Sequence, residues 1–172
     1  MMFQEQVTRK LTPRQYMFFN HLSMYIDKDL YFYGSIARAD YIASKSDIDL
    51  AIFTDNDMST IYQLCNVLNI KKNEFKKTVY RIGETVVHGF KVRYADPSRE
   101  IETEISVYDD KYKSLVIQDQ KRSDSLPFYV TFLLYIVKIL FYDLHIISKK
   151  GYKRVKRFLM SADDEVNFIE VL

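Results

Sequence analysis

The sequence contains few of the residues that disulfide-rich, collagen-like or linker-rich proteins need. Its 172 residues include one cysteine, three prolines, four glycines and no tryptophan. The single cysteine, Cys65, excludes an internal disulfide framework and a cysteine-based zinc site. We therefore expect a reducing compartment, the cytoplasm. The N-terminal stretch MMFQEQVTRK also lacks the apolar segment that a secretory signal peptide requires.

A large net charge of either sign is absent too. Lys and Arg number 25 and Asp and Glu 23, so the formal net charge is +2. Bulk charge therefore does not predict a nucleic-acid-binding protein, and only a local basic patch could supply such binding. Hydrophobic residues make up 48% and charged residues 28%, which is typical of a globular protein, and the length fits a single domain.

The spacing of apolar residues predicts an α+β fold, a mixed β-sheet with flanking helices. We expect a core over residues 1–122 and a helical C-terminal region over 123–172 that packs on it within one domain. Helices are predicted from Thr12 to Ile26, over 59–68, from Leu126 to about Ser148 with a break at Gly151, and from Ser161 onward. Strands are predicted over 30–33, 47–53, 75–82, 85–94 and 99–108, with a short helical turn over 36–43.

A turn suited to phosphate binding follows the first predicted strand. Gly34 and Ser35 lie where that strand gives way to a helical turn. Backbone N–H groups at such a place, together with the positive end of a helix dipole, favour an anion. Glycine allows a phosphate to approach the backbone closely, and the Ser35 hydroxyl can donate a hydrogen bond to a phosphate oxygen.

A pair of acidic residues lies on the next predicted strand. Asp47 and Asp49 are two residues apart, so both carboxylates project from one face of the strand. Two such charges repel by about 2 kcal/mol at an effective dielectric constant of about 20, and a divalent cation removes that repulsion. Mg²⁺ favours carboxylates, waters and substrate phosphates. A phosphate-binding turn beside such a site suits phosphoryl or nucleotidyl transfer with two metal ions.

The predicted strand over 99–108 can supply a third carboxylate. Glu102 and Glu104 share one face of this strand by parity, so either residue qualifies. We favour Glu104, because an apolar residue follows it directly, as Leu50 follows Asp49. Glu102 remains the alternative.

The segments GSIARAD at 34–40 and SDIDL at 46–50 resemble the signature of the polymerase β-like nucleotidyltransferase superfamily, in particular its minimal and antibiotic-modifying branches. The resemblance implies a palm-like core, an NTP donor and two Mg²⁺ ions, with Mn²⁺ as an alternative metal. It also implies that Asp47, Asp49 and Glu104 are the catalytic and metal-binding residues.

Further nucleotide contacts are expected from the same two segments. Gly34 and Ser35 would hold the β and γ phosphates, while Arg38 and Lys45 can pair with triphosphate oxygens. Ser46 completes the expected nucleotide-binding set. A solvated surface pair is the alternative interpretation of Arg38 and Lys45.

The C-terminal region contains an apolar helix. Residues 128–142 are apolar almost all round, but the helix would be about 22 Å long, shorter than the roughly 30 Å core of a bilayer. We therefore expect no membrane span but a buried or interface helix, with residues 128–147 as the face for a homo-oligomer or partner. Thr131, Lys138 and His145 recur every seven residues and form one polar stripe, facing either the active-site cleft or solvent.

A basic run follows the apolar helix. Residues 149–157 carry six positive charges in nine positions, on a predicted amphipathic helix. One interpretation is a solvated helix face, and the other is binding of RNA, DNA or another anionic acceptor.

These features predict an ATP-binding, Mg²⁺-dependent nucleotidyltransferase that moves a nucleoside monophosphate, AMP by the resemblance, from Mg-NTP to an acceptor hydroxyl. The acceptor expected first is a small molecule or a protein. The alternatives are transfer to a nucleic-acid 3′ end, which the run at 149–157 favours, and a catalytically inactive nucleotide-binding or interaction module.

Overall fold

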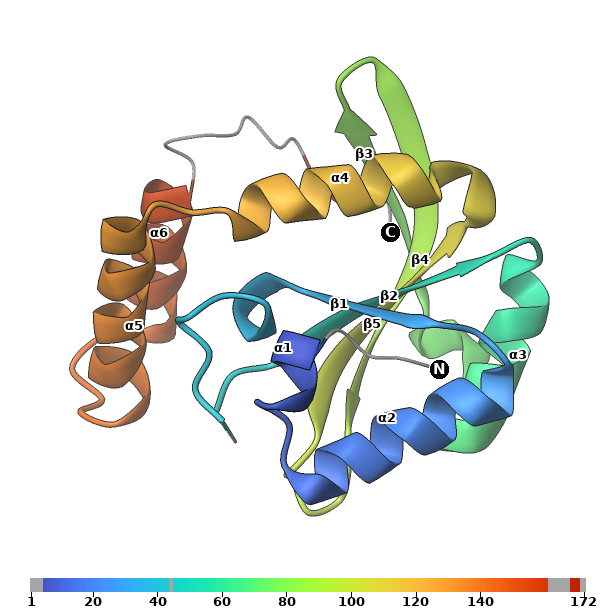
Figure 1. Cartoon of the computed structure of the whole chain (residues 1–172), viewed down its shortest axis with the longest axis horizontal. Helices are drawn as coiled ribbons and strands as arrows, with labels where there is room; N and C mark the ends of the chain where they lie inside the picture. Colours follow the sequence, from blue (N-terminus) through green and yellow to red (C-terminus); the bar gives the residue numbers. More distant parts are fainter. Residues whose placement is uncertain (1–4, 44, 161–167, 171–172) are drawn as a thin grey trace.

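The computed structural model describes residues 5–43, 45–160 and 168–170. In it, helices flank a six-stranded mixed sheet with the strand order β1-β2-β5-β4-β3-β6 (Figure 1). The strands are β1 (Leu30–Tyr33), β2 (Ile48–Thr54), β3 (Lys76–Ile82), β4 (Thr85–Ala95), β5 (Glu102–Asp109) and β6 (Phe168–Glu170). The α-helices are α1 (Glu5–Thr8), α2 (Pro13–Ile26), α3 (Asp57–Leu68), α4 (Lys113–Asp124), α5 (Phe128–Tyr142) and α6 (Lys149–Met160). Three short 3₁₀ turns complete the described part: η1 (Gly34–Ile36), η2 (Lys72–Glu74) and η3 (Asp110–Tyr112).

The direction of the strands makes the sheet mixed. Strands β2 and β5 run parallel, whereas β1–β2, β4–β5, β3–β4 and β3–β6 are antiparallel pairs. The predicted α+β class with a mixed sheet is therefore confirmed. The five strands predicted from the sequence match β1 to β5 within a few residues at each end.

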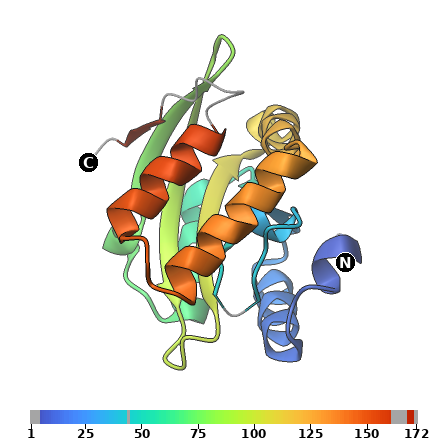
Figure 2. The same cartoon turned by 90° about the vertical axis from the view of Figure 1, so that its left-hand side faces the viewer.

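Helices cover the two faces of the sheet differently. On one face, α2 and α3 bury a large apolar core, in which Phe19, Leu64 and Ile105 are fully buried. On the other face, α4 packs over a smaller core that includes Phe53, Tyr108 and Val116. Helices α5 and α6 pack against each other at one side of the molecule (Figures 1 and 2). The second face is therefore covered by α4 only in part.

The start of α2 confirms the helix predicted from the sequence. Thr12 Oγ1 accepts a hydrogen bond from the Gln15 backbone N–H at 3.2 Å, and Gln15 Oε1 accepts one from the Thr12 N–H at 3.0 Å. This reciprocal pair is a capping box, and Pro13 occupies the first helical position. The helix ends at Ile26, where Asp27 adopts a left-handed conformation.

Three local predictions are wrong. Instead of a helical turn over 36–43, the structure has the short turn η1 followed by irregular chain. Helix α5 ends at Tyr142, well before Ser148. Gly151 does not break a helix but lies in the first turn of α6, where its N–H donates to the Ser148 hydroxyl at 3.2 Å. Ser148 thus caps a new helix, and a glycine in that first turn breaks no established ladder of hydrogen bonds.

The predicted last helix from Ser161 begins outside the described residues. Residues 168–170 form the strand β6, which pairs with β3, so they do not continue a helix. The predicted boundary between a core over residues 1–122 and a helical region over 123–172 stays a prediction.

Within the described residues, no single helix is both long and apolar enough to cross a membrane. Residues Asp110–Asp124 and Phe128–Tyr142 satisfy the length and composition criteria only together, as a pair bent by 79°.

Candidate functional site

The strand register brings four polar side chains into one row across the sheet. Asp49 on β2 lies level with Tyr33 on β1 and with Glu104 on β5. Glu104 in turn lies level with Arg93 on β4. These positions share the face on which α4 packs, because the alternate residues Leu50 and Ile105 belong to the core under α2 and α3.

The carboxyl group of Asp49 lies directly against the turn that follows β1. A Cβ atom added to Gly34 would meet Asp49 Oδ2 at 2.6 Å, and the φ angle of Gly34 is +72°. Both observations require glycine at this position. Burial, reinforced by the charge of Glu104, raises the pKa of Asp49 to about 7. The carboxyl group is therefore held where its charge is unfavourable without a cation.

Glu104 has the opposite electrostatic environment. Its Oε1 pairs with Lys91 Nζ at 2.8 Å, and its Oε2 pairs with Arg93 Nε at 2.8 Å. Burial opposes ionisation of this carboxyl, but the two cations outweigh that effect and lower its pKa. Glu104 is therefore an ionised group that two basic side chains already neutralise.

The other two acidic candidates lie nearer the edge of this face. Asp47 is exposed just before β2 begins. Glu102 pairs with Arg99 at 3.4 Å, and its side chain is 43% exposed. Glu104, and not Glu102, lies level with Asp49. The register therefore favours Glu104 as the third carboxylate beside Asp49.

The Gly34–Ser35 turn already holds an anionic group of the chain itself. Asp124, the last residue of α4, accepts a hydrogen bond from the Gly34 N–H at 2.9 Å. Burial raises the pKa of this carboxyl to about 6, although Arg38 acts in the opposite direction. Within the described part of the chain the Ser35 hydroxyl makes no hydrogen bond. The turn thus has an anion at one N–H group and an uncommitted hydroxyl next to it.

The expected phosphate contact of Arg38 needs correction. Its side chain is 4% exposed and forms two hydrogen bonds with Asp40, at 2.8 and 3.3 Å. A third contact, at 3.5 Å, reaches Asp124. Asp40 is itself buried, and the hydrogen bonds from Arg38 lower its pKa despite that burial. Since a buried carboxylate needs such a partner, Arg38 stabilises the loop and does not face an open site.

The expected polar stripe on the apolar helix also differs from the structure. Lys138 faces neither an open cleft nor solvent: it is 3% exposed, and its Nζ donates to the Asp40 carbonyl at 2.8 Å and to Ser46 Oγ at 3.1 Å. A further ion pair joins Lys138 to the Asp40 carboxylate at 3.0 Å. Ser46 is therefore buried and bonded to the chain rather than open to a ligand. Lys45 is exposed and pairs with Asp143.

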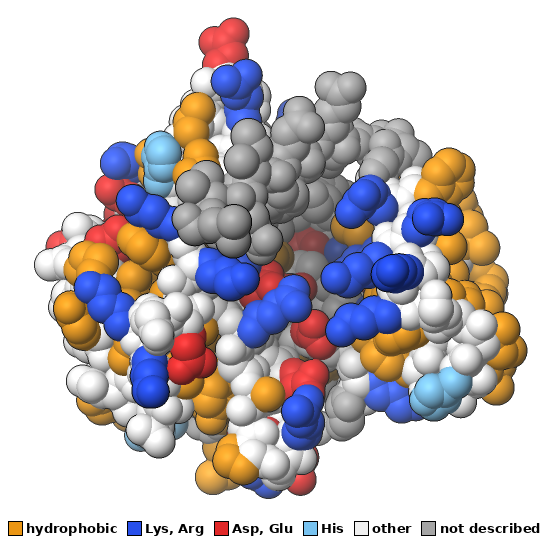
Figure 3. Space-filling view, turned by 180° about the vertical axis from the view of Figure 1, so that it is seen from behind, with side chains coloured by type: hydrophobic (Ala, Val, Ile, Leu, Met, Phe, Trp, Pro, Cys, Tyr) orange, Lys and Arg blue, Asp and Glu red, His pale blue; other side chains and the backbone are white. Residues whose placement is uncertain are grey.

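The basic helix α6 acts on the acidic row through the charge of Lys156. The charge of Lys156 lowers the pKa of Asp49, although less than burial raises it. On the same helix, burial raises the pKa of Tyr152, and the charges of Asp40 and Asp47 add to that effect. Figure 3, which views the molecule from behind relative to Figure 1, shows acidic side chains near the middle of that view, with Lys and Arg side chains on both sides of them. The acidic row is therefore influenced by positive charge from β4, through Lys91 and Arg93, and from α6, through Lys156.

The donor set fits a hard cation in chemistry but is not assembled as a metal site. Asp47, Asp49 and Glu104 offer carboxylate oxygens, the ligands that Mg²⁺ prefers. Among the residues that the structure describes, no group of three or more His, Cys, Asp or Glu side chains is arranged to hold a metal ion. Both oxygens of Glu104 are in ion pairs. Each of these oxygens keeps a second lone pair, so a cation would share Glu104 with its basic partners.

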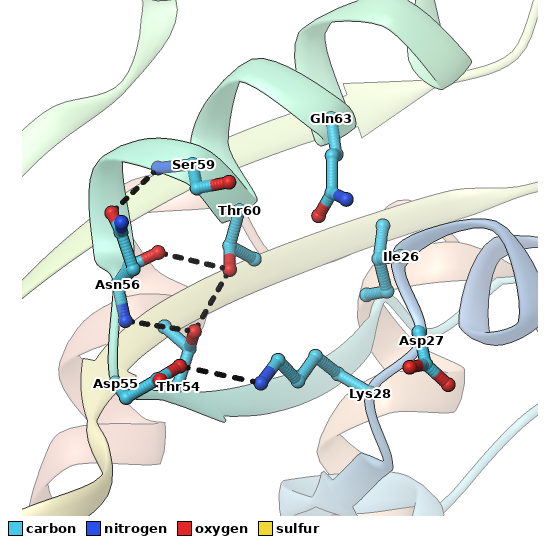
Figure 4. Close-up of a pocket in the computed structure, with 9 residues that line it drawn as sticks. All are labelled: Ile26, Asp27, Lys28, Thr54, Asp55, Asn56, Ser59, Thr60 and Gln63. Carbon is cyan, nitrogen blue, oxygen red and sulfur yellow. Dashed lines mark hydrogen bonds and ion pairs between the residues drawn. The ribbon is translucent and has the colours of Figure 1, made fainter.

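A hollow at the far end of β2 is unrelated to the acidic row. It is lined by the last residue of β2 and the start of α3, among them Thr54, Asn56 and Thr60 (Figure 4). Asn56 Oδ1 accepts from the Ser59 N–H at 3.0 Å, and the Thr60 hydroxyl donates to Thr54 at 3.0 Å. These polar groups cap α3 and pair with one another, so the hollow has a structural explanation.

The sequence analysis did not identify Lys91, Arg93 or Asp124 as residues of this region. It identified Lys138 but not its partner, Asp40. Lys91 and Arg93 alternate along a predicted strand, and their shared parity with Glu104 in a paired strand was the signal that could have found them. Nothing in the local sequence connects Asp124 with Gly34 or Lys138 with the loop after η1, because these contacts span 90 and 98 residues.

Comparison with known proteins gives one match in sequence. The family model of the nucleotidyltransferase domain matches residues 18–122. Comparison with curated proteins finds no match.

Solved structures give weaker likenesses. The GLD-2/RNP-8 complex is 18% identical, with a TM-score of 0.43, over 96% of this chain and 59% of that chain. The Cid1 poly(U) polymerase with MgGTP bound is 15% identical, with a TM-score of 0.45, over 79% of this chain and 42% of that one. The GLD-2–GLD-3 non-canonical poly(A) polymerase complex is 18% identical, with a TM-score of 0.41, over 79% and 44%. This chain therefore spans less than two thirds of the length of each of these structures. Because the family model covers more than half of its residues, the chain belongs to the nucleotidyltransferase domain family.

Proposed function

We propose that this protein transfers a nucleoside monophosphate from an NTP to an acceptor hydroxyl. The observation that carries the proposal is the row of carboxylates beside the Gly34–Ser35 turn. Asp49 lies against Gly34 and level with Glu104, and Asp47 is exposed just before β2 begins. Metal-assisted nucleotidyl transfer uses these two elements, a phosphate-binding turn and acidic metal ligands, side by side.

Asp47, Asp49 and Glu104 are the residues that would hold two Mg²⁺ ions, with Mn²⁺ as an alternative. When bound, such ions neutralise the phosphate charge and polarise the phosphoryl group under attack. The raised pKa of Asp49 fits this role. Burial disfavours the ionised form of this carboxyl group, and a bound cation would stabilise that form. The lowered pKa of Glu104 makes it a weak proton acceptor, which favours a ligand role over that of general base.

The chain's own groups would orient the donor. The Ser35 hydroxyl is free to donate to a phosphate oxygen, and Lys45 at the rim supplies a positive charge. Lys156 on α6 adds another charge near Asp49. In the transfer itself, the acceptor oxygen forms a bond to the α-phosphorus and the bond to the bridging oxygen breaks. Pyrophosphate leaves, and the hydroxyl proton passes to solvent. No residue of the described site selects the base, so ATP remains the expectation from the family resemblance.

A nucleic-acid 3′ end is the acceptor that the structure favours over a small molecule or protein hydroxyl. The supporting observation is the basic helix α6, on which the charge of Lys156 lowers the pKa of Asp49. A helix rich in Lys and Arg next to a reaction centre attracts a phosphate backbone. The same charges would do little for a neutral small molecule.

The first prediction concerns the two aspartates. We expect Asp47→Asn and Asp49→Asn each to lower nucleotidyl transfer by at least about a hundredfold, because each removes a carboxylate worth several kcal/mol to the transition state. Label transfer from an α-labelled NTP to an RNA oligonucleotide measures this, with a protein and an aminoglycoside as other acceptors.

Asp55→Asn is the matched control. Asp55 is exposed at the far end of β2 and pairs only loosely with Lys28, at 3.5 Å. If Asp47→Asn and Asp49→Asn retain as much nucleotidyl transfer as Asp55→Asn does, the proposed mechanism is contradicted.

The second prediction uses the raised pKa of Asp49, about 7. The folded protein keeps a proton that the unfolded chain loses near pH 4, so its free energy of unfolding falls as pH rises from about 4 to about 7. We expect Asp49→Asn, which cannot ionise, to be more stable than the parent by a few kcal/mol at pH 8 and close to it near pH 4. Urea unfolding in EDTA across this range measures the difference, and parallel stability curves would contradict it.

The third prediction concerns α6. A triple variant with glutamine at Lys153, Lys156 and Arg157 should bind RNA oligonucleotides more weakly. The slope of log K against log salt should also become less steep, by about 0.7 for each RNA phosphate that no longer pairs with a basic side chain. Fluorescence anisotropy at several salt concentrations measures both quantities.

The control for α6 is a second triple variant. Lys76, Lys77 and Arg81 are exposed on β3, so changing them to glutamine alters the net charge equally. An equal loss of RNA affinity in the two triple variants would mean that α6 contributes only bulk charge.

A further inference from the structure

Helix α5 presents two different faces. Val130, Leu134 and Val137 are buried against the rest of the molecule, and Lys138 reaches inward to Asp40. The exposed apolar residues of the helix form a separate set: Phe128 (82%), Tyr129 (66%), Phe132 (53%), Leu133 (42%), Tyr135 (40%) and Ile136 (36%). At about 100° per residue these exposed residues occupy a continuous arc of roughly 160° around the helix. We call this set the outer face of α5.

The outer face is larger than an ordinary exposed patch. Large apolar and aromatic side chains have surfaces of roughly 150–250 Å² each, so these exposed fractions leave roughly 600 Å² uncovered. That value lies at the upper end of what soluble monomers expose in one patch. Figures 1 and 2 show α5 at the outside of the molecule, with α6 beside it and no other described helix over its outward side.

The composition of the outer face suits a second copy of the same surface. Lys138 is the only charged residue of α5, and it points inward, so two outer faces meet without repulsion between charges. Two copies would bury roughly 1,200 Å² in total, which is above the roughly 1,000 Å² that a specific interface requires. The aromatic residues Phe128 and Phe132, whose rings stack with centroids 6.3 Å apart, are of the type that forms the centre of such interfaces.

We propose that the protein forms a homodimer in which the outer faces of two α5 helices pack against each other across a two-fold axis. The pairing is isologous, because the same surface is used by both copies. It leaves the acidic row open, since the inner side of α5 faces the core and its outer side points away from it. The proposal does not depend on the proposed function.

The test is the mass of the protein in solution. Sedimentation velocity from low to high micromolar concentration should show the parent chain at twice its mass of 20.5 kDa. Phe132→Glu should weaken the dimer by at least roughly thirtyfold, as expected when a central interface residue is removed. Phe128→Glu serves as a second variant that should fold, because an acidic residue is favourable in the first turn of a helix.

Tyr62→Glu is the matched control, because Tyr62 on α3 is 53% exposed, as is Phe132. It should remain dimeric. A parent chain that stays monomeric at all concentrations overturns the proposal, and so does a dimer that survives both changes on α5. Vesicle or partner binding by a monomeric parent would assign the outer face to another occupant.

A second inference rests on a different observation and on the proposed function. The Asp124 carboxylate accepts the Gly34 N–H at 2.9 Å and contacts Arg38 at 3.5 Å, with its side chain 14% exposed. It thus connects the end of α4 to the turn that lies against Asp49. We infer that Asp124 is a positioning residue of the nucleotide site, acting through the backbone of Gly34.

Titration calorimetry with Mg-ATP and Mg-UTP tests this role. Asp124→Ala removes the acceptor and should weaken nucleotide binding about tenfold. Asp124→Asn keeps an acceptor oxygen for the Gly34 N–H and should restore most of that affinity, which a loss of general stability would not do. If the parent binds no nucleotide, the proposed function fails. If the parent binds and Asp124→Ala binds equally well, only this inference fails.

Discussion

The parallel pairing of β2 with β5 is the constraint on which the candidate site depends. It places Asp49 level with Glu104, although 55 residues separate them in the chain. The pairing is fixed by hydrophobic parity, because a one-residue slip of either strand would turn its own apolar residue, Leu50 or Ile105, out of the main core and its carboxylate into it. The same burial that specifies the register thus determines which acidic side chains meet.

Buried charge is the second organising element. Arg38, Asp40 and Lys138 are each less than 10% exposed, and they are paired with one another or with the backbone. Such groups are costly to bury and strongly destabilising to separate, so they hold together the segments that they join. Here they join the loop after η1, the end of α4 and the inner face of α5. Residues that resemble ligands in the sequence are therefore used to hold the turn in place.

The electrostatics of the acidic row are uneven. Among the described residues, Asp49 forms an ion pair with no cation, whereas Glu104 forms ion pairs with two. Lys91 and Arg93 of β4 pair with Glu104, and the charge of Lys156 on α6 lowers the pKa of Asp49.

Local patterns in the sequence were enough to predict the strands, the capped helix from Thr12 and the position of the paired aspartates, because these follow from periodicity and short-range hydrogen bonds. Glu104 could also be indicated in this way, since parity on one strand is a local property. Only the tertiary structure decided that Arg38 and Lys138 are buried, that Asp124 reaches Gly34, and that Lys138 reaches Asp40. Those contacts join segments about 90 residues apart, and no local pattern encodes which distant partner satisfies a charged side chain.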